Sequence, residues 1–391
     1  MKIPTYQTLA GQRFFEGSLG KADIRWRVAN TMEQEVRGYA KDLENAGFVL
    51  QQAKEIPAGS DYPYNVNLFY CYQNGEACVF VFFDASQHTV FITAEPMQAL
   101  PSAESVAATG EYTPSVTQMA VSGLSFVIQL CDGSFICLDG GRSRETFEQD
   151  MYAFLTSKTG GKKPRIALWV FTHPHEDHIY FATSFLRKYR EKVDVDAFAY
   201  QFADHTKVPL TMENTTKIVA DIQAFEESVR LYENAKVYTL HTGQSYYFSG
   251  AELEVLYTLD NTYPMQYCSL NDTNAVVRVK FDGGKAVMLM GDQMCTQCRD
   301  MAHTYGDYLK SDILQVTHHG LIGGDRWLYE KIDAEICLWP TEKARFDGEW
   351  TRQPYQWCLG EGGCDYNAYL RDDSVRKRKH YHMDQIVTIE I

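Results

Sequence analysis

The stretch Phe171-Thr-His-Pro-His-Glu-Asp-His178 constrains the fold of this chain more than any other. It follows an apolar run, residues 166–171, that is typical of a buried strand. Apolar side chains at helical spacing follow it over residues 179–189. The turn between this predicted strand and this predicted helix therefore holds four possible metal ligands: His173, His175, Asp177 and His178.

A metal site explains this turn better than ordinary packing does. Side chains alternate in an extended segment, so His173 and His175 point to the same side. Asp177 and His178 come a short turn later, where they can serve a second ion. A single His in a turn is usually solvated, but clustered imidazoles repel one another when protonated and need partners when buried. We therefore predict a metal centre here.

The composition is that of an ordinary soluble globular protein. The 391 residues, 45% of them hydrophobic and 23% charged, suffice for one large domain or two. The ten Cys show no disulfide-framework spacing, and the lone Cys295-Thr-Gln-Cys298 is expected to be reduced and packed. No apolar run approaches the ~20 residues of a membrane helix, and no signal peptide is visible. We expect a cytoplasmic protein with no membrane partner.

The formal net charge of −14 bears on the partners. It disfavours sequence-independent nucleic-acid binding, which depends on neutralising phosphates. It still allows a small anionic substrate, because bound cations dominate the field near a metal site. The basic run Arg376-Lys-Arg-Lys379 is expected to be a solvated face.

The chain is predicted to divide into residues 1–112, a small α+β domain, and residues 113–391, which carry the motifs. The first part shows an amphipathic helix over 31–47 and a meander of strands at 67–72, 77–83 and 89–93. Residues 100–111 are the best linker candidate. This domain could form a lid, a partner-binding module or the interface of a homo-oligomer.

In the second part, predicted strands end four times in acids or imidazoles: at Asp139, at the 173–178 turn, at Asp292 and at His318-His319. Two adjacent divalent ions need mixed imidazole and carboxylate ligands. His173, His175 and one of the two late His residues could hold one ion. Asp177, His178 and Asp292 could hold the other, with Asp292 bridging. Asp139 is expected to fix the tautomer of a ligand imidazole.

These strings resemble a known family. His173-Pro-His-Glu-Asp-His178 matches the HxHxDH motif of metallo-β-lactamase-fold hydrolases, Asp139-Gly-Gly141 their first motif, and Gly291-Asp292 their bridging acid. Residues 271–279 together with Leu314-Gln-Val-Thr-His-His-Gly320 are similar to the soluble hydrolase domain of bacterial DNA-uptake (competence) channel proteins. Over residues 116–391 the resemblance implies an α/β fold, an αββα sandwich with the site along the strand ends.

Two parts of the family pattern are missing. Many members carry a further His as Gly-His, whereas this chain offers only His241, two residues before Gly243. The DNA-uptake relatives often carry a late His-Pro, where this chain has Gln353-Pro354. His380 and His382 are alternatives for the gap, although bordering the last strand suits them better. One ion instead of two is therefore a second possibility.

The function expected is that of a hydrolase that uses a metal-bound hydroxide, with a phosphoester or phosphodiester as substrate. Lactone, ester or β-lactam hydrolysis is the alternative within enzymes, and a catalytically decayed metal-binding scaffold is the alternative outside them. Asp177 and His319 are the expected catalytic residues. The expected metal ligands are His173, His175, Asp177, His178, Asp292 and His318. Two Zn²⁺ ions are expected, and Mn²⁺ or Fe²⁺ would fit similar ligands.

Overall fold

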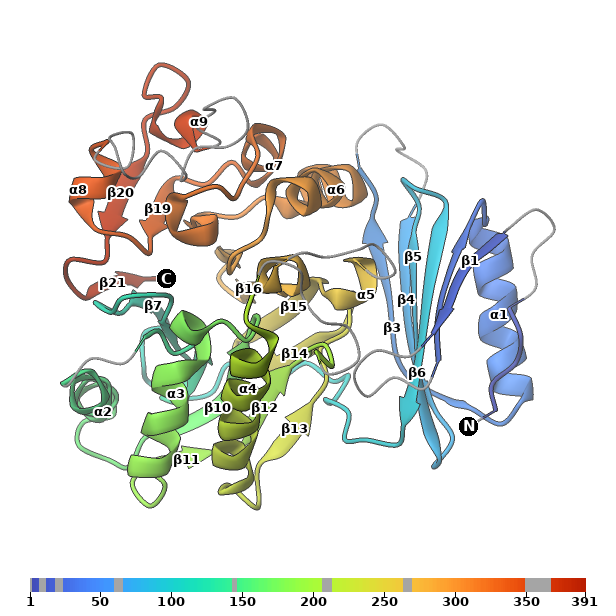
Figure 1. The fold of residues 1–391 in the computed structure, drawn as a ribbon, viewed down its shortest axis with the longest axis horizontal. Coiled ribbons are helices and arrows are strands. Elements are labelled where there is room, and N and C mark those ends of the chain that lie inside the picture. The colour runs from blue at the N-terminus through green and yellow to red at the C-terminus, as the bar shows by residue number, and fades with distance from the viewer. Residues whose placement is uncertain are drawn as a thin grey trace.

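The structure is a computed structural model, and it describes residues 2–6, 12–17, 24–59, 66–142, 146–205, 213–262, 269–348 and 367–391. Its strands form three sheets, one in the N-terminal part and two in the remainder (Figure 1). Among the described residues, no helix is both long and apolar enough to cross a membrane.

The N-terminal sheet is antiparallel, in the order β1-β2-β6-β5-β4-β3. The predicted meander is present, and the sequence prediction missed the first three strands. Helix α1 (Glu33–Asn45) buries Val36, Tyr39, Ala40 and Leu43, which recur at helical spacing, against one face of this sheet. The strands are β1 (Gln12–Gly17), β2 (Ile24–Ala29), β3 (Val49–Pro57), β4 (Val66–Gln73), β5 (Ala77–Asp84) and β6 (Thr89–Pro96).

The second sheet has the order β13-β12-β10-β9-β8-β7-β21, with β11 beside β10. Strands β9, β10, β12 and β13 are parallel, so their carboxyl ends share one edge. Its strands are β7 (Ser115–Gln118), β8 (Phe126–Gln129), β9 (Phe135–Leu138), β10 (Arg165–Phe171), β11 (Asp194–Val195), β12 (Ala197–Tyr200), β13 (Lys236–Tyr238) and β21 (Val387–Glu390). The helices that pack on this sheet are α2 (Phe147–Lys158), α3 (Glu176–Lys188) and α4 (Thr215–Arg230).

The third sheet has the order β14-β15-β16-β17-β18-β19-β20, with β17 to β20 parallel. Its strands are β14 (Ser245–Phe248), β15 (Ala251–Tyr257), β16 (Val276–Phe281), β17 (Ala286–Leu289), β18 (Ile313–Gln315), β19 (Ile336–Trp339) and β20 (Lys379–His382). The helices in this part are α5 (Leu259–Thr262), η1 (Leu270–Thr273), α6 (Cys295–Tyr305), η2 (Gly306–Leu309), η3 (Thr317–Gly320), α7 (Arg326–Ile332), α8 (Lys343–Phe346) and α9 (Ala368–Arg371).

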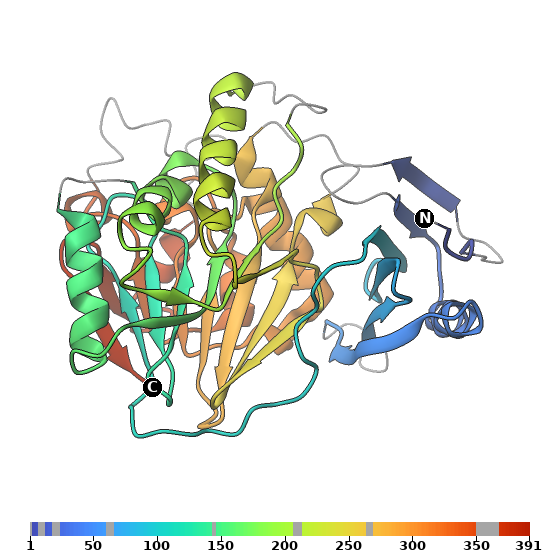
Figure 2. The ribbon, with the colours of Figure 1, turned by 90° about the horizontal axis from the view of Figure 1, so that it is seen from below.

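The second and third sheets face each other, and helices cover both outer faces (Figures 1 and 2). Leu168 and Val170 of β10 pack with Val277 of β16 and Leu289 of β17 in the core between the sheets. Phe181 and Phe185 belong to the layer of α2, α3 and α4, and Met301 to that of α6 and α7. This arrangement is an αββα sandwich, and the predicted fold class is confirmed.

The N-terminal sheet packs on the sandwich through the face that α1 leaves free (Figure 1). Phe69, Phe80 and Phe82 of this sheet share one buried cluster with Met301 and Tyr305 of α6. The boundary between residues 112 and 113 stays a prediction.

Two minor expectations have clear outcomes. Cys298 is buried, and the Cys295 and Cys298 thiols are both free, as expected for packed cysteines. The expectation that residues 376–379 form a solvated face is wrong in part. Arg378 is buried over the ring of Tyr369, and Arg376 contacts Asp333.

Candidate metal centre

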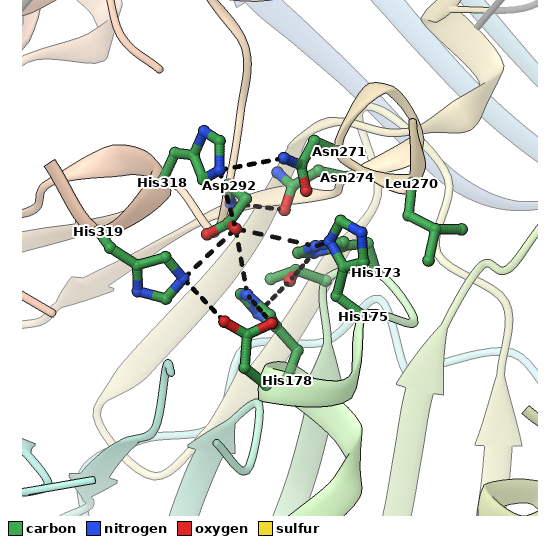
Figure 3. A network of polar contacts seen from close by, with 12 residues as sticks. His173, His175, His178, Leu270, Asn271, Asn274, Asp292, His318 and His319 are labelled. Carbon is green, nitrogen blue, oxygen red and sulfur yellow. Dashed lines mark hydrogen bonds and ion pairs between the residues drawn. The ribbon is translucent and has the colours of Figure 1, made fainter. Parts of the chain in front are cut away.

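The motif residues lie at the carboxyl ends of strands from both sheets of the sandwich. β10 ends at Phe171 and runs directly into His173. His175 is the N-cap residue of α3, so Asp177 and His178 lie in the first turn of that helix. Asp292 follows β17, and His318-His319 follows β18. Because β17, β18 and β10 present their ends at the same edge, residues far apart in sequence meet there (Figure 3).

Asp292 lies at the centre of the cluster, and its Oδ2 faces four imidazoles (Figure 3). The Nε2 atoms of His178 and His319 lie 3.3 and 3.4 Å from this oxygen. Those of His318 and His173 lie 3.8 and 3.9 Å from it. One carboxylate oxygen among four imidazoles can serve two ions at once.

Asp177 lies on one side of this centre, with His319. Asp177 Oδ2 is 3.4 Å from His319 Nε2, and Asp177 Oδ1 is 3.9 Å from His178 Nε2. The facing atoms of Asp177, His178 and His319 lie within 4.8 Å of one another, as do those of His173, His178 and Asp292. The geometry thus places His319 beside Asp177 and His178, where a second ion would bind.

Hydrogen bonds fix the orientation of three imidazoles. Asp139 Oδ2 accepts from Nδ1 of His178 at 2.7 Å, in a fully buried pair. Thr172 donates to both oxygens of Asp139, from its amide and its hydroxyl, each at 2.7 Å, and that hydroxyl lies 3.1 Å from Nδ1 of His173. The carbonyl of Pro340 accepts from Nδ1 of His319 at 3.1 Å. Each Nε2 is thereby turned toward Asp292, and Asp139 has the role that the sequence predicts.

His175 has a partner that the sequence prediction missed. Its Nδ1 lies 2.8 Å from Nε2 of His173, and its Nε2 lies 3.1 Å from Oε2 of Glu213. Glu213 precedes the Asn214 cap of α4, far from any strand-end motif, so no sequence pattern distinguishes it. Asn271 Nδ2 lies 3.2 Å from Nε2 of His318 and is a second contact that the sequence did not indicate.

The backbone is strained at the site. His318 and His319 have φ values of 48° and 55°, and Asp139 has a φ of 52°. Residues other than glycine pay for this left-handed conformation, and such strain concentrates at functional sites. In this conformation the imidazoles of His318 and His319 both face Asp292.

The carboxylates of the site favour positive charge on the imidazole of His319, and the imidazoles favour negative charge on Asp292. Burial alone would lower the pKa of His319, but Asp292 and Asp177 raise it to about 10. Burial tends to raise the pKa of Asp292, yet the surrounding imidazoles hold it well below its usual range. Burial lowers the pKa of His318 to about 4. Bound cations would take the place of the protons on these imidazoles.

The buried polar atoms of the centre fit a pair of metal ions. Nε2 of His178, Nε2 of His319 and Oδ1 of Asp292 are buried and have no hydrogen-bond partner. Such atoms are costly unless something binds them. Imidazole nitrogens and carboxylate oxygens are ligands for Zn²⁺, and also for Mn²⁺ or Fe²⁺.

An open cleft of about 370 Å³ leads to the centre. Asp177, Asp292, His318 and His319 are among the residues that line it. Among the described residues, its charged lining comprises two cations, Arg142 and Lys217, and five carboxylates, which are Glu176, Asp177, Glu213, Asp221 and Asp292. The cleft is therefore acidic unless cations bind in it.

The alternative ligands lie elsewhere. His241 stacks on Phe80 at 3.6 Å between ring centroids, and its Nδ1 lies 2.7 Å from Asp260 Oδ2. His380 and His382 lie on β20, where His380 accepts from the indole N–H of Trp339. Gln353-Pro354 lies outside the described residues.

No family model and no curated protein matches this chain. Solved structures that match include the diiron β-hydroxylase CmlA from Streptomyces venezuelae, with 11% identity over 76% of this chain and 55% of that one, at a TM-score of 0.42. This chain thus spans about half of the length of CmlA. Another is the metallo-β-lactamase-fold protein YhfI from Bacillus subtilis, with 12% identity over 71% of this chain and all of that one, at a TM-score of 0.40.

Human tRNase Z, short form, also matches, with 11% identity over 57% of this chain and 90% of that one, at a TM-score of 0.33. At such identities and TM-scores, these likenesses assign neither a subfamily nor a substrate.

Proposed function

We propose that this protein is a metal-dependent hydrolase with a two-metal centre formed by His173, His175, Asp177, His178, Asp292, His318 and His319. The observation that carries the proposal is the convergence of buried, unpartnered ligand atoms on Asp292. Asp292 would be shared by the two ions; His173, His175 and His318 would hold one, and Asp177, His178 and His319 would hold the other. Two divalent ions would supply Lewis-acid activation of water and of the scissile bond.

The protein's own residues supply orientation and charge. Asp139 and the Pro340 carbonyl keep protons on the outer nitrogens of His178 and His319, so the inner nitrogens remain available as ligands. The strained backbone of His318 and His319 fixes the direction of their own side chains. Because these groups are held before substrate arrives, little reorganisation is needed at the moment of reaction.

We propose a phosphoester, mono- or diester, as the substrate class. Two divalent ions would reverse the negative charge of the carboxylate-rich cleft and attract an anionic group. The open cleft, of about 370 Å³, is large enough for a small molecule.

The test is metal analysis of the purified protein, followed by assays on a chromogenic phosphodiester, a phosphomonoester, a lactone and a β-lactam. Bound metal with chelator-sensitive phosphoester turnover is expected. Turnover of the lactone or β-lactam alone would move the substrate class to acyl compounds, and bound metal without any turnover would indicate a binding scaffold.

Asp177→Asn separates catalysis from scaffolding. We expect it to lower kcat/KM by about 100-fold or more, because it removes a charged ligand atom from the centre. Asp150→Asn, on an exposed position of α2, is the matched control and should leave kcat/KM unchanged. Full activity of Asp177→Asn would contradict the hydrolytic role.

A further inference from the structure

Among the imidazoles that are candidate ligands, His175 has the most exposed side chain. Its side chain is 26% exposed, against 0% for His173 and His178. Packing therefore restricts the rotation of this ring less than that of the buried rings. Something other than burial must set its orientation.

The Glu213 carboxylate provides that restraint. Oε2 lies 3.1 Å from Nε2 of His175, and since an ionised carboxylate only accepts, that nitrogen carries the proton. The lone pair of a neutral ring is then on Nδ1, which lies 2.8 Å from Nε2 of His173. His175 Nδ1 therefore faces His173 Nε2, which in turn lies 3.9 Å from Asp292 Oδ2.

Glu213 is itself anchored to a second part of the site. Its Oε1 accepts from the amide of Leu270 at 3.0 Å. Leu270 begins η1, and the next residue, Asn271, contacts His318. One carboxylate therefore ties His175, at the start of α3, to the segment that supports His318 on the opposite wall.

We propose that Glu213 is a positioning residue, which holds His175 as an Nδ1 ligand and fixes the distance between the two walls of the centre. This inference rests on the proposed metal-dependent function. It assigns to Glu213 a contribution to metal affinity that no motif indicates.

The experiment compares Glu213→Ala and Glu213→Gln with the wild type and with Glu226→Gln. Glu226 lies on the same helix, α4, and pairs with Arg230 at the surface, so its variant controls for the loss of one charge. Circular dichroism and thermal unfolding establish that each variant is folded. The two readouts are the His175 ring tautomer and the affinity for Zn²⁺ alone.

The tautomer is read from ring ¹⁵N shifts of the metal-free protein, with the His175 signals assigned by their loss in His175→Gln. We expect the Nε2–H form in the wild type and a mixture of tautomers in Glu213→Ala. Competition with a chromophoric chelator should show Zn²⁺ binding weakened by about 10- to 100-fold in Glu213→Ala. Glu213→Gln retains a carbonyl acceptor, so its Zn²⁺ affinity should fall less than that of Glu213→Ala.

The failures can be told apart. Unchanged tautomer and unchanged Zn²⁺ affinity in both Glu213 variants would overturn the role of Glu213, even if the wild type hydrolyses phosphoesters. A wild type that binds Zn²⁺ without turnover, with Zn²⁺ affinity that depends on Glu213, would overturn the hydrolase and support the role of Glu213. If the wild type binds no Zn²⁺, the metal centre fails and the tautomer alone decides whether Glu213 orients His175.

Discussion

Asp139 shows how much one buried residue contributes at this site. Its carboxylate accepts hydrogen bonds from Thr172 and from His178. Asp139 directly follows β9 and has a φ of 52°. Asn tolerates this left-handed conformation better than most residues do. A change to Asn therefore alters the acceptor without forcing the backbone to move.

We expect Asp139→Asn to weaken Zn²⁺ binding by about 10- to 100-fold, since His178 loses the carboxylate that sets its tautomer. Chelator competition measures the effect, and Asp150→Asn serves as the control on the surface. Wild-type affinity in the Asn variant would show that Asp139 does not orient His178.

At the scale of elements, the segment after β18 depends on its packing against β19. Gly320 follows His318 and His319 with a φ of 73°, and a Cβ added there would lie 2.6 Å from the indole ring of Trp339. The indole is buried and cannot move aside. The segment can therefore take its strained form only with Gly at this position.

Gly320→Ala should lower the free energy of unfolding by about 1–3 kcal/mol and weaken Zn²⁺ binding, because the backbone that aims both imidazoles must shift. Gly283→Ala is the matched control, since an added Cβ meets nothing within 4 Å there. Chemical denaturation and chelator competition provide the two measurements. Equal behaviour of the two Ala variants would contradict this account.

At the scale of the whole molecule, charged groups join the N-terminal sheet to the sandwich. Glu254 on β15 contacts Lys54 of β3 and lies 2.6 Å from Arg278 of β16. In a second group, Asp260 lies 2.5 Å from Arg25 of β2 and 2.7 Å from His241. Separation of the two parts would take Lys54 away from Glu254 and Arg25 away from Asp260, and breaking buried ion pairs is strongly destabilising.

The pH dependence of stability should report on Glu254. Burial tends to raise its pKa, but Arg278, Lys54 and Lys280 lower it from 4.5 to about 2. A depressed folded-state pKa stabilises the fold above pH 4.5, and this stabilisation is lost as the pH falls toward 2. Its full size is about 3 kcal/mol. Denaturant unfolding between pH 7 and pH 3 should show a steeper loss in the wild type than in Glu254→Gln, and parallel curves would refute the assignment.

Residues 113–391 alone should not fold stably, although the sequence predicts a domain boundary at 112. Their isolation would expose the apolar surface of α6 that Phe69, Phe80 and Phe82 cover. It would also remove the partners of Asp260 and Glu254 on the N-terminal sheet. We expect aggregation or a non-cooperative thermal transition. A monomer with a cooperative transition would show that the sandwich is independent.

The sequence by itself determined the features with short-range causes. The ligands from His173 to His178 lie within one turn, and the strand and helix around them follow from local apolar periodicity. The recurrence of acids and imidazoles at strand ends was sufficient to predict that these side chains lie together and that Asp139 contacts one of the imidazoles. Strand β3 escaped prediction because most of its residues are exposed, and pairing with β4 decides its conformation.

Only the tertiary structure decided the rest. It placed His319 with Asp177, put His241 against Phe80, and brought Glu213 to His175. Each of these contacts joins residues on different elements. A small change in the path of the backbone, or in which elements pack together, would break it. Local pattern can identify a ligand by its chemistry, but the distance to its partner depends on how the two sheets and the N-terminal unit pack together.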